Sequence, residues 1–167
     1  MTRTAYGRFG VALLVLTLGV ACSDVNSGSG PEGQPLPADQ VDTLVVASMS
    51  GFHVSIRQVI NTELGWQGFW GEYQAYMAPA QPMPAIDFTK KMVIAASMGS
   101  RPTGGFSIRI ESVLRNGDGY DVGIVETSPG SSCVVTQAVT APVTAVAVPA
   151  TDGDIHFFDR KTVHDCG

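Results

Sequence analysis

One short stretch of the sequence constrains the fold of this chain more than any other. Residues 116–119 read Asn-Gly-Asp-Gly, and both of these dipeptides tolerate the positive φ angles that a tight β-hairpin requires. Apolar and polar side chains alternate before the turn, over residues 106–111, and after it, over residues 120–125. Alternation with a period of two is typical of a strand with one buried face. The sequence therefore predicts a hairpin, and with it a domain built mainly from strands.

Further segments have the composition of short strands. Residues 41–49 and 52–60 are rich in β-favourable side chains and are separated by a Ser-Gly pair. Residues 92–98 form a nearly continuous apolar run, which fits a central strand that is buried on both faces. Residues 143–148 and 155–163 provide two more candidates. Since most of these segments are short and separated by turn residues, we expect them to pair mainly antiparallel.

A single helix is predicted over residues 62–77. Thr62 or Asn61 can cap its start by accepting a backbone N–H bond. Aromatic and apolar side chains recur at helical spacing along one face: Trp66, Phe69, Trp70, Tyr73 and Met77. Prolines in residues 79–84 then end the helix, because proline cannot continue it. The predicted fold class is mainly β (α+β): an antiparallel sheet or sandwich with one packed amphipathic helix.

The overall composition excludes two broad classes of protein. Hydrophobic residues make up 44% of the chain, which is too many for a disordered protein. Charged residues make up only 15% and the net charge is −5, whereas a nucleic-acid binder normally carries a basic patch. We therefore expect a folded domain that does not bind nucleic acid.

The first residues are typical of a secretory signal peptide. Arg3 and Arg8 precede an uncharged run over residues 11–21 that is too short to span a membrane. Its end, at Cys22, resembles a bacterial lipobox, although Leu18 lies one place earlier than the lipobox leucine. This resemblance implies that residues 1–21 are removed and that Cys22 is lipidated. An ordinary signal peptide with a chance cysteine is the alternative.

The residues after Cys22 predict a tether followed by one domain. Residues 22–40 are rich in Ser, Gly and Pro, as in a flexible linker. Residues 28–33 match G-x-G-x-x-G on paper, but a dinucleotide site needs a strand before the motif and a helix starting within it, and Pro31 together with the linker composition argues against both. The folded domain is expected over residues 41–167.

One motif resembles a known family. Residues 92–98 are followed by the pattern G-x-R-P-T-G-G-F, whose defined positions are Gly99, Arg101, Pro102, Thr103, Gly104, Gly105 and Phe106. An alternating strand follows. This arrangement resembles the C-terminal domain of the protease stability complex PrcB-like family, and weaker similarities extend it over residues 57–166, to Trp66 and Trp70 upstream and to Cys133 and Cys166 downstream. The resemblance implies a lipoprotein that assists the assembly or stability of a surface protease complex, with no catalytic residues to carry over.

The loop 101–106 has two interpretations. Pro102 restricts the backbone at Arg101, and Gly104 and Gly105 allow close approach of another segment, so the motif can exist for its geometry alone. Alternatively it is a rigid recognition loop, with Arg101 and Phe106 beside it, that binds a protein partner. A short similarity to the N-P-T-T-G-Y/F loop of chagasin-like cysteine-protease inhibitors adds a second candidate function, direct protease inhibition. A purely structural envelope lipoprotein is the third.

The two remaining cysteines predict a disulfide. In the oxidising envelope compartment, Cys133 and Cys166 are expected to pair. Free thiols are the alternative. A bridge would hold the C-terminal strand in place.

The sequence gives little support for a catalytic site. His156 and His164 lie on one predicted strand, too far apart to share a metal ion, and His53 is expected to face outward with no chemical role. No G-x-S-x-G, H-E-x-x-H or C-x-x-C pattern occurs. We therefore expect a non-enzymatic module without metal or cofactor. It would be held by its N-terminal lipid in the bacterial cell envelope, periplasmic or exposed at the surface.

Overall fold

The structure is a computed structural model that describes residues 30–167. The predicted signal peptide, Cys22 and residues 23–29 of the predicted tether lie outside the described residues.

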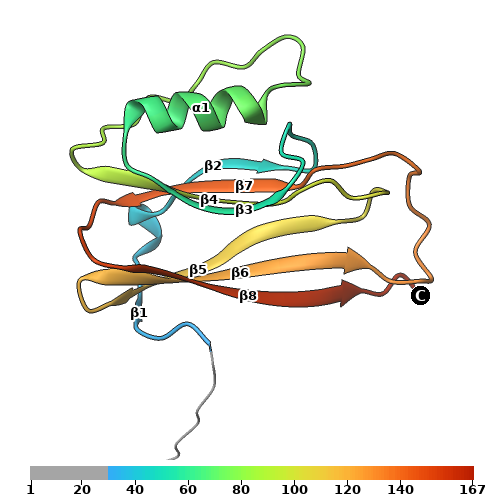
Figure 1. Cartoon of the computed structure of the whole chain (residues 1–167). Helices are drawn as coiled ribbons and strands as arrows, with labels where there is room; N and C mark the ends of the chain where they lie inside the picture. Colours follow the sequence, from blue (N-terminus) through green and yellow to red (C-terminus); the bar gives the residue numbers. More distant parts are fainter. Residues whose placement is uncertain (1–29) are drawn as a thin grey trace, which may run out of the picture.

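Two four-stranded sheets pack face to face, and one α-helix covers the outer face of one sheet (Figure 1). The first sheet has the strand order β1-β5-β6-β8 and the second has the order β2-β7-β4-β3. In chain order the elements are β1 (Gln34–Pro35), η1 (Ala38–Gln40), β2 (Asp42–Ala47), β3 (Ser55–Ile60), α1 (Glu63–Tyr73), β4 (Lys91–Met98), β5 (Ser107–Asn116), β6 (Gly119–Pro129), β7 (Val143–Pro149) and β8 (Ile155–His164). The predicted class, mainly β with a single packed helix, is confirmed for this part of the chain.

One strand pair differs from the antiparallel expectation. All neighbouring strands are antiparallel except β6 and β8, which run parallel. The reason is the path of the chain: after β6 it enters the second sheet as β7, runs back, and returns to the first sheet as β8 (Figure 1). A parallel pair needs such a crossover, whereas the hairpin of β5 and β6 needs only the tight turn at Gly117.

Strand β4 separates two hydrophobic cores, which explains why its sequence is apolar without interruption. Met92, Ile94 and Ala96 face the core between the two sheets. Val93 and Ala95 face the core under α1. A strand buried on both faces has no solvent side on which polar residues could alternate. The prediction of a buried central strand over residues 92–98 is confirmed.

Helix α1 is shorter than predicted, ending at Tyr73 instead of Met77. It begins after Thr62, whose hydroxyl accepts the Gly65 N–H at 3.2 Å, as expected of an N-cap. The aromatic stripe packs on the sheet, and the Trp66 side chain is 0% exposed. No helix within residues 30–167 is long and apolar enough to cross a membrane.

Residues 30–40 correct the tether prediction, because they pack on the sandwich as a strap: β1 lies on the first sheet and η1 contacts β7 of the second. Gln34 and Pro35 pair with β5, and the Leu36 N–H donates to the Val113 carbonyl at 3.0 Å. The Glu32 N–H donates to the buried Asp121 carboxylate at 2.9 Å. The linker-like composition gave no sign of these contacts. Their partners, the edge of β5 and the Asp121 carboxylate, belong to the β5–β6 hairpin, which is distant in the sequence.

An ion cluster closes the side of the sandwich where β3 and β8 lie. Arg57 on β3 donates from Nη2 to Glu126 Oε1 at 2.6 Å and from Nε to Asp159 Oδ1 at 2.8 Å. Glu126 belongs to β6 and is buried. Charges this enclosed are tolerated when paired and hydrogen bonded, and the cluster thereby ties the second sheet to the first.

Candidate functional site

Three irregular connections between strands gather at one end of the sandwich, called here the loop end (Figure 1, right side). It comprises residues 48–54, 99–106 and 130–142, and the C-terminal residues 165–167 lie beside them. The end of α1 joins them, since the Gly51 N–H donates to the Glu72 carbonyl at 3.0 Å. The loop that the sequence singled out therefore lies beside two others.

The loop 99–106 is hydrogen bonded along its length to residues 136–140. Arg101 and Thr140 exchange two backbone bonds, at 2.7 and 3.0 Å, and the Gly104 N–H donates to the Thr136 carbonyl at 2.9 Å. The Thr140 hydroxyl donates to the Thr103 carbonyl at 2.8 Å. Because both segments lack regular structure, these bonds satisfy backbone groups that a strand ladder would otherwise satisfy.

Glycines allow the close packing of this loop. Gly99 has a φ of +70°, and a Cβ there would lie 2.7 Å from the backbone of Val54. A Cβ on Gly104 would overlap the Thr136 hydroxyl, and one on Gly105 would lie 2.9 Å from the Val135 side chain. The motif glycines are thus required for geometry, as the first interpretation of the loop proposes.

Of the other motif residues, some are held by contacts with the rest of the protein and others are exposed to solvent. Arg101 is half-buried, donates from Nη2 to the Met98 carbonyl at 2.8 Å and lies 5.9 Å from the centre of the Phe106 ring. Its Nε is buried without a hydrogen-bond partner among the described residues. Phe106 packs against the core between the sheets, whereas Pro102 is exposed. A role of these residues in binding a partner stays a prediction.

A polar cluster that the sequence did not single out lies beside the loop. His53 is exposed and precedes β3 instead of lying on it. Its Nδ1 lies 3.3 Å from the Ser100 hydroxyl, and its Nε2 lies 3.2 Å from the Tyr76 hydroxyl. A serine–histidine pair can act as nucleophile and base, but within residues 30–167 the imidazole is hydrogen bonded to Ser100 and Tyr76 and to no carboxylate that would orient it. The cluster offers hydrogen-bonding groups to a partner instead.

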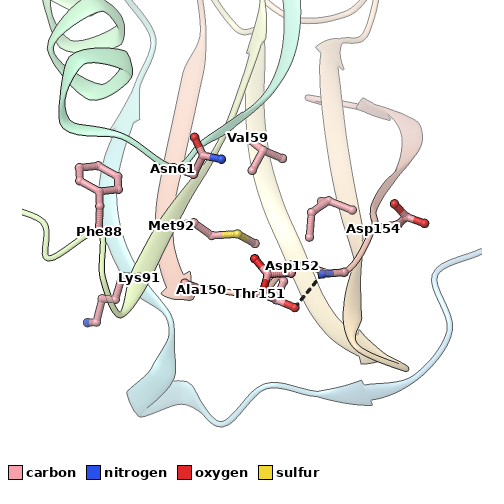
Figure 2. A pocket seen from close by; sticks show the side chains of 11 residues that line it. Val59, Asn61, Phe88, Lys91, Met92, Ala150, Thr151, Asp152 and Asp154 are labelled. Carbon is pink, nitrogen blue, oxygen red and sulfur yellow. Dashed lines mark hydrogen bonds between the residues drawn. The ribbon is translucent and has the colours of Figure 1, made fainter.

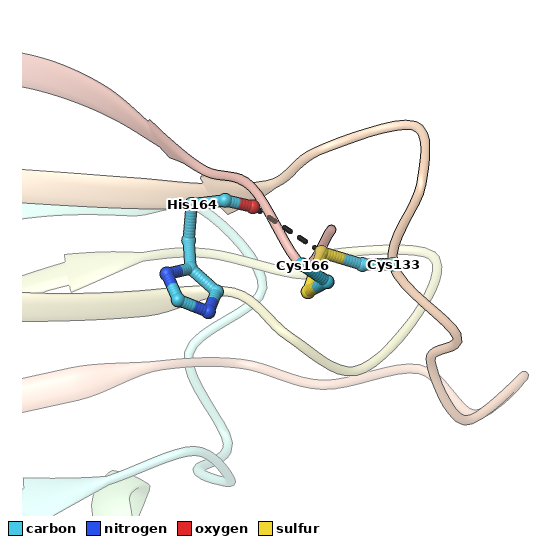
Figure 3. The surroundings of a disulfide bond; sticks show 3 residues. All are labelled: Cys133, His164 and Cys166. Atoms are coloured by element: carbon cyan, nitrogen blue, oxygen red, sulfur yellow. Dashed lines mark hydrogen bonds between the residues drawn. A yellow bond between two sulfur atoms is a disulfide. The ribbon is translucent and has the colours of Figure 1, made fainter.

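The predicted disulfide between Cys133 and Cys166 is present (Figure 3). It joins residues 130–142 to the end of β8, where the Gly130 N–H also donates to the His164 carbonyl at 2.8 Å. The Cys133 Sγ lies 3.2 Å from that carbonyl oxygen, and because a disulfide sulfur has no proton, this is a contact and not a hydrogen bond. His156 and His164 lie at opposite ends of β8, as predicted.

Charge is nearly absent from the loop end, while apolar side chains are exposed there. Arg101 is the only Asp, Glu, Lys or Arg within residues 48–54, 99–106 and 130–142. The exposed apolar side chains at this end, called the loop-end patch, are Met49, Val54, Tyr76, Val134 and Val139. Depletion of charge together with exposed apolar and tyrosine side chains is typical of the centre of a protein interface.

The opposite end of the sandwich, called the turn end, holds a cavity of about 620 Å³ (Figure 2). Val59, Met92 and Ile155 form part of its wall, and Asp152 and Asp154 are among its polar residues. Sequence reasoning missed this cavity because three distant segments form it. Within residues 30–167, no group of three or more His, Cys, Asp or Glu side chains is arranged to hold a metal ion.

Asp121 is the most buried carboxylate, at 2% exposure, and it anchors the strap. Burial alone raises the pKa of this carboxyl. The hydrogen bonds from the Glu32 N–H, His156 and Asn116 outweigh that effect, so the pKa of Asp121 lies below its usual value of 3.8. The carboxylate is therefore ionised at neutral pH and serves a structural purpose.

Comparison with known proteins gives one match. The family model described as PrcB C-terminal matches residues 92–149. This range extends from β4 to β7 and contains both the loop 99–106 and its neighbour 130–142, whereas β3, α1 and Cys166 lie outside it. Searches of the curated proteins and of the solved structures found no match.

Proposed function

We propose, from the PrcB-like C-terminal domain that residues 92–149 form, that this protein is an accessory module that binds and stabilises a protein partner. The partner is a secreted or surface protease complex, and the module itself is not catalytic. Lipid on Cys22 would hold it in the bacterial cell envelope.

The loop-end patch is the observation that carries this proposal. A protein gains nothing in its own fold from exposing Val54, Tyr76 and Val139 at an end of the sandwich where charged side chains are few. A partner that covers these side chains removes their apolar surface from water, which favours association. The loops are held by hydrogen bonds and a disulfide, so little conformational freedom is lost on binding.

The chagasin-like alternative is less well supported by the contacts of the loop. A loop of that kind inhibits by offering side chains and free main-chain groups to the protease cleft. Here Phe106 packs on the core, and main-chain groups of Arg101 and Gly104 are already bonded to residues 136–140.

Substitution of the loop-end patch tests the proposal. In membranes from cells that express the full-length protein, Val54→Glu combined with Val139→Glu is expected to reduce recovery of a cross-linked protease at least about tenfold. An unpaired carboxylate buried in an apolar interface costs more than the ~1.4 kcal/mol that a tenfold loss represents. Leu64→Glu is the matched control, because Leu64 is 78% exposed on α1 and lies away from the loop end.

The outcomes separate the candidate functions. Loss of the protease only with the loop-end variant supports an accessory module. Equal recovery with both variants contradicts the loop-end interface. If no partner is recovered with the unaltered protein, a purely structural envelope lipoprotein is favoured instead. Intact-mass measurement of the N-terminal peptide tests lipidation separately, and an unmodified Cys22 contradicts the anchor.

A further inference from the structure

We propose that residues 133–136 are a substrate-like protease-binding loop, and that Val134 enters the specificity pocket of a serine protease that cleaves after small aliphatic residues. The inference rests on the proposed function in one respect, namely that the partner is a protease. It differs from the chagasin-like alternative both in the loop used and in the class of protease.

The exposure of Val134 is the first observation. Its side chain is 103% exposed, so nothing in the described part of the chain covers any of it. Cys133 and Val135, on either side, are half-buried, and Thr136 is again exposed. Residues 133–136 belong to no strand or helix, but this alternation of burial is the one expected where successive side chains point in opposite directions. Val134 therefore points away from the body of the protein while its neighbours face it.

The second observation is that both neighbours of Val134 are held. Cys133 is joined by the disulfide to Cys166, and Val135 packs against Gly105. The carbonyl of Thr136 accepts the Gly104 N–H. Figure 3 shows how the segment passes the disulfide at the end of the molecule. An exposed apolar side chain on a braced segment is preorganised for a pocket, which favours affinity because ordering costs are small.

The backbone of Val134 is available to a partner. Neither its N–H nor its carbonyl takes part in a hydrogen bond among the described residues. A peptide that adds as an extended strand is recognised through its main-chain groups for affinity and through alternate side chains for specificity. A serine protease reads the residue before the cleaved bond in one pocket, which is small in elastase and carries an aspartate in trypsin. Valine fits the small, apolar form of this pocket.

The position of the disulfide fits an inhibitor better than a substrate. Hydrolysis of the Val134–Val135 amide would add water across the bond, leaving a carboxylate on Val134 and an amine on Val135. Cys133 would then belong to one fragment and Cys166 to the other, so the disulfide would keep the fragments joined. The new ends stay close together, which opposes release and favours re-formation of the bond. A protease accessory with such a loop would protect its partner from self-digestion.

The test uses the full-length protein, purified in detergent, and pancreatic elastase assayed with a small chromogenic peptide. The unaltered protein is expected to slow elastase at least about tenfold when in excess, and Val134→Asp to abolish this effect. Val134→Lys should no longer inhibit elastase and should inhibit trypsin instead, because the trypsin pocket binds lysine. Leu64→Lys is the control, because Leu64 is 78% exposed on α1 and lies outside the loop-end patch, and it should behave like the unaltered protein.

Thermal unfolding of each variant ensures that the loop and not the fold is altered, and a fully exposed position such as Val134 should leave the transition unchanged. The proposal is overturned if the unaltered protein leaves elastase at full activity, if Val134→Asp inhibits as well as the unaltered protein, or if elastase degrades the chain at another site. Any of these results, combined with protease capture by the loop-end patch, would leave the accessory function intact.

Discussion

The loop end and the turn end of this sandwich are built from segments of different character. At the turn end two connections are short: the β5–β6 turn has Gly117 and Asp118 at its tip, and residues 150–154 join β7 to β8. A third, residues 61–90, joins β3 to β4 and carries helix α1. Short turns satisfy most of their own backbone and leave charged side chains in water. At the loop end the connections are long, nearly uncharged and bonded to one another.

The difference shows what long loops require. Residues 99–106 and 130–142 have too many backbone groups to leave unsatisfied, so each supplies partners to the other, and glycines permit the close approach. What remains exposed is apolar and has no structural partner, which is why we place recognition at this end. The turn end has a cavity and more charge, with Asp118, Asp152 and Asp154 on its two short turns.

Removal of the disulfide should have the largest effect. Cys133→Ser with Cys166→Ser opens a loop of sequence separation 33, which is expected to cost about 3–4 kcal/mol of unfolding free energy. Urea denaturation measures the loss. Local opening should be concentrated at the loop end, so hydrogen exchange should quicken more in residues 130–142 and at the end of β8 than at the β5–β6 turn. Equal quickening at both ends would contradict the local role.

A pair of glycine substitutions compares the two ends directly. Gly99 and Gly117 both have positive φ, at +70° and +59°, but a Cβ meets the Val54 backbone at Gly99 and nothing within 4 Å at Gly117. Gly99→Ala should therefore cost about 3 kcal/mol, from backbone strain and overpacking together, and Gly117→Ala about 1 kcal/mol from strain alone. Similar shifts in the urea midpoint for both variants would show that the loop end relaxes around the added methyl group.

Acid should loosen the strap on the first sheet. Because the pKa of Asp121 is lower in the folded protein than its usual 3.8, the stability that it contributes is present above that value and is lost as the pH falls below it. Asp121→Asn should cost about 1–2 kcal/mol at neutral pH and weaken the dependence of stability on pH below 4. Asp87 and Glu111 also have lowered pKa values, so the difference between variant and unaltered protein isolates Asp121.

The smallest effect is expected at the turn end. Lys91 and Asp42 form an ion pair that joins the starts of β4 and β2, and both side chains are exposed. Lys91→Gln should change the unfolding free energy by less than about 0.5 kcal/mol, since solvent screens such pairs. Chemical denaturation in low and high salt checks this. A larger loss would mean that surface charge contributes more to the turn end than the comparison implies.

Much of the fold could be predicted from short-range pattern. The alternation around residues 116–119, the apolar run 92–98 and the N-cap at Thr62 each depend on neighbours in the sequence, and the structure has these elements in place. The parallel pairing of β8 with β6 and the strap 30–40 could not be predicted in this way. Both depend on contacts with strands distant in sequence, which residue periodicity does not report.

The candidate site could likewise be predicted only in part from the sequence. The motif 101–106 and the pairing of Cys133 with Cys166 could be read from residue types, because glycine, proline and cysteine have narrow structural uses. The exposure of Val134, the cluster around His53 and the bonds between residues 101–104 and 136–140 could not. They exist because three separate loops meet at one end of the sandwich.

The sequence by itself determined the local elements, the mainly β class and the disulfide, because those follow from propensity, alternation and residue chemistry within short windows. Tertiary structure alone decided which loops lie at the same end of the sandwich, that Arg101 is half-buried and that the Val134 side chain is fully exposed. Those outcomes depend on how two sheets stack and on the path between them, and the energy of each contact is realised only once its distant partner is in place.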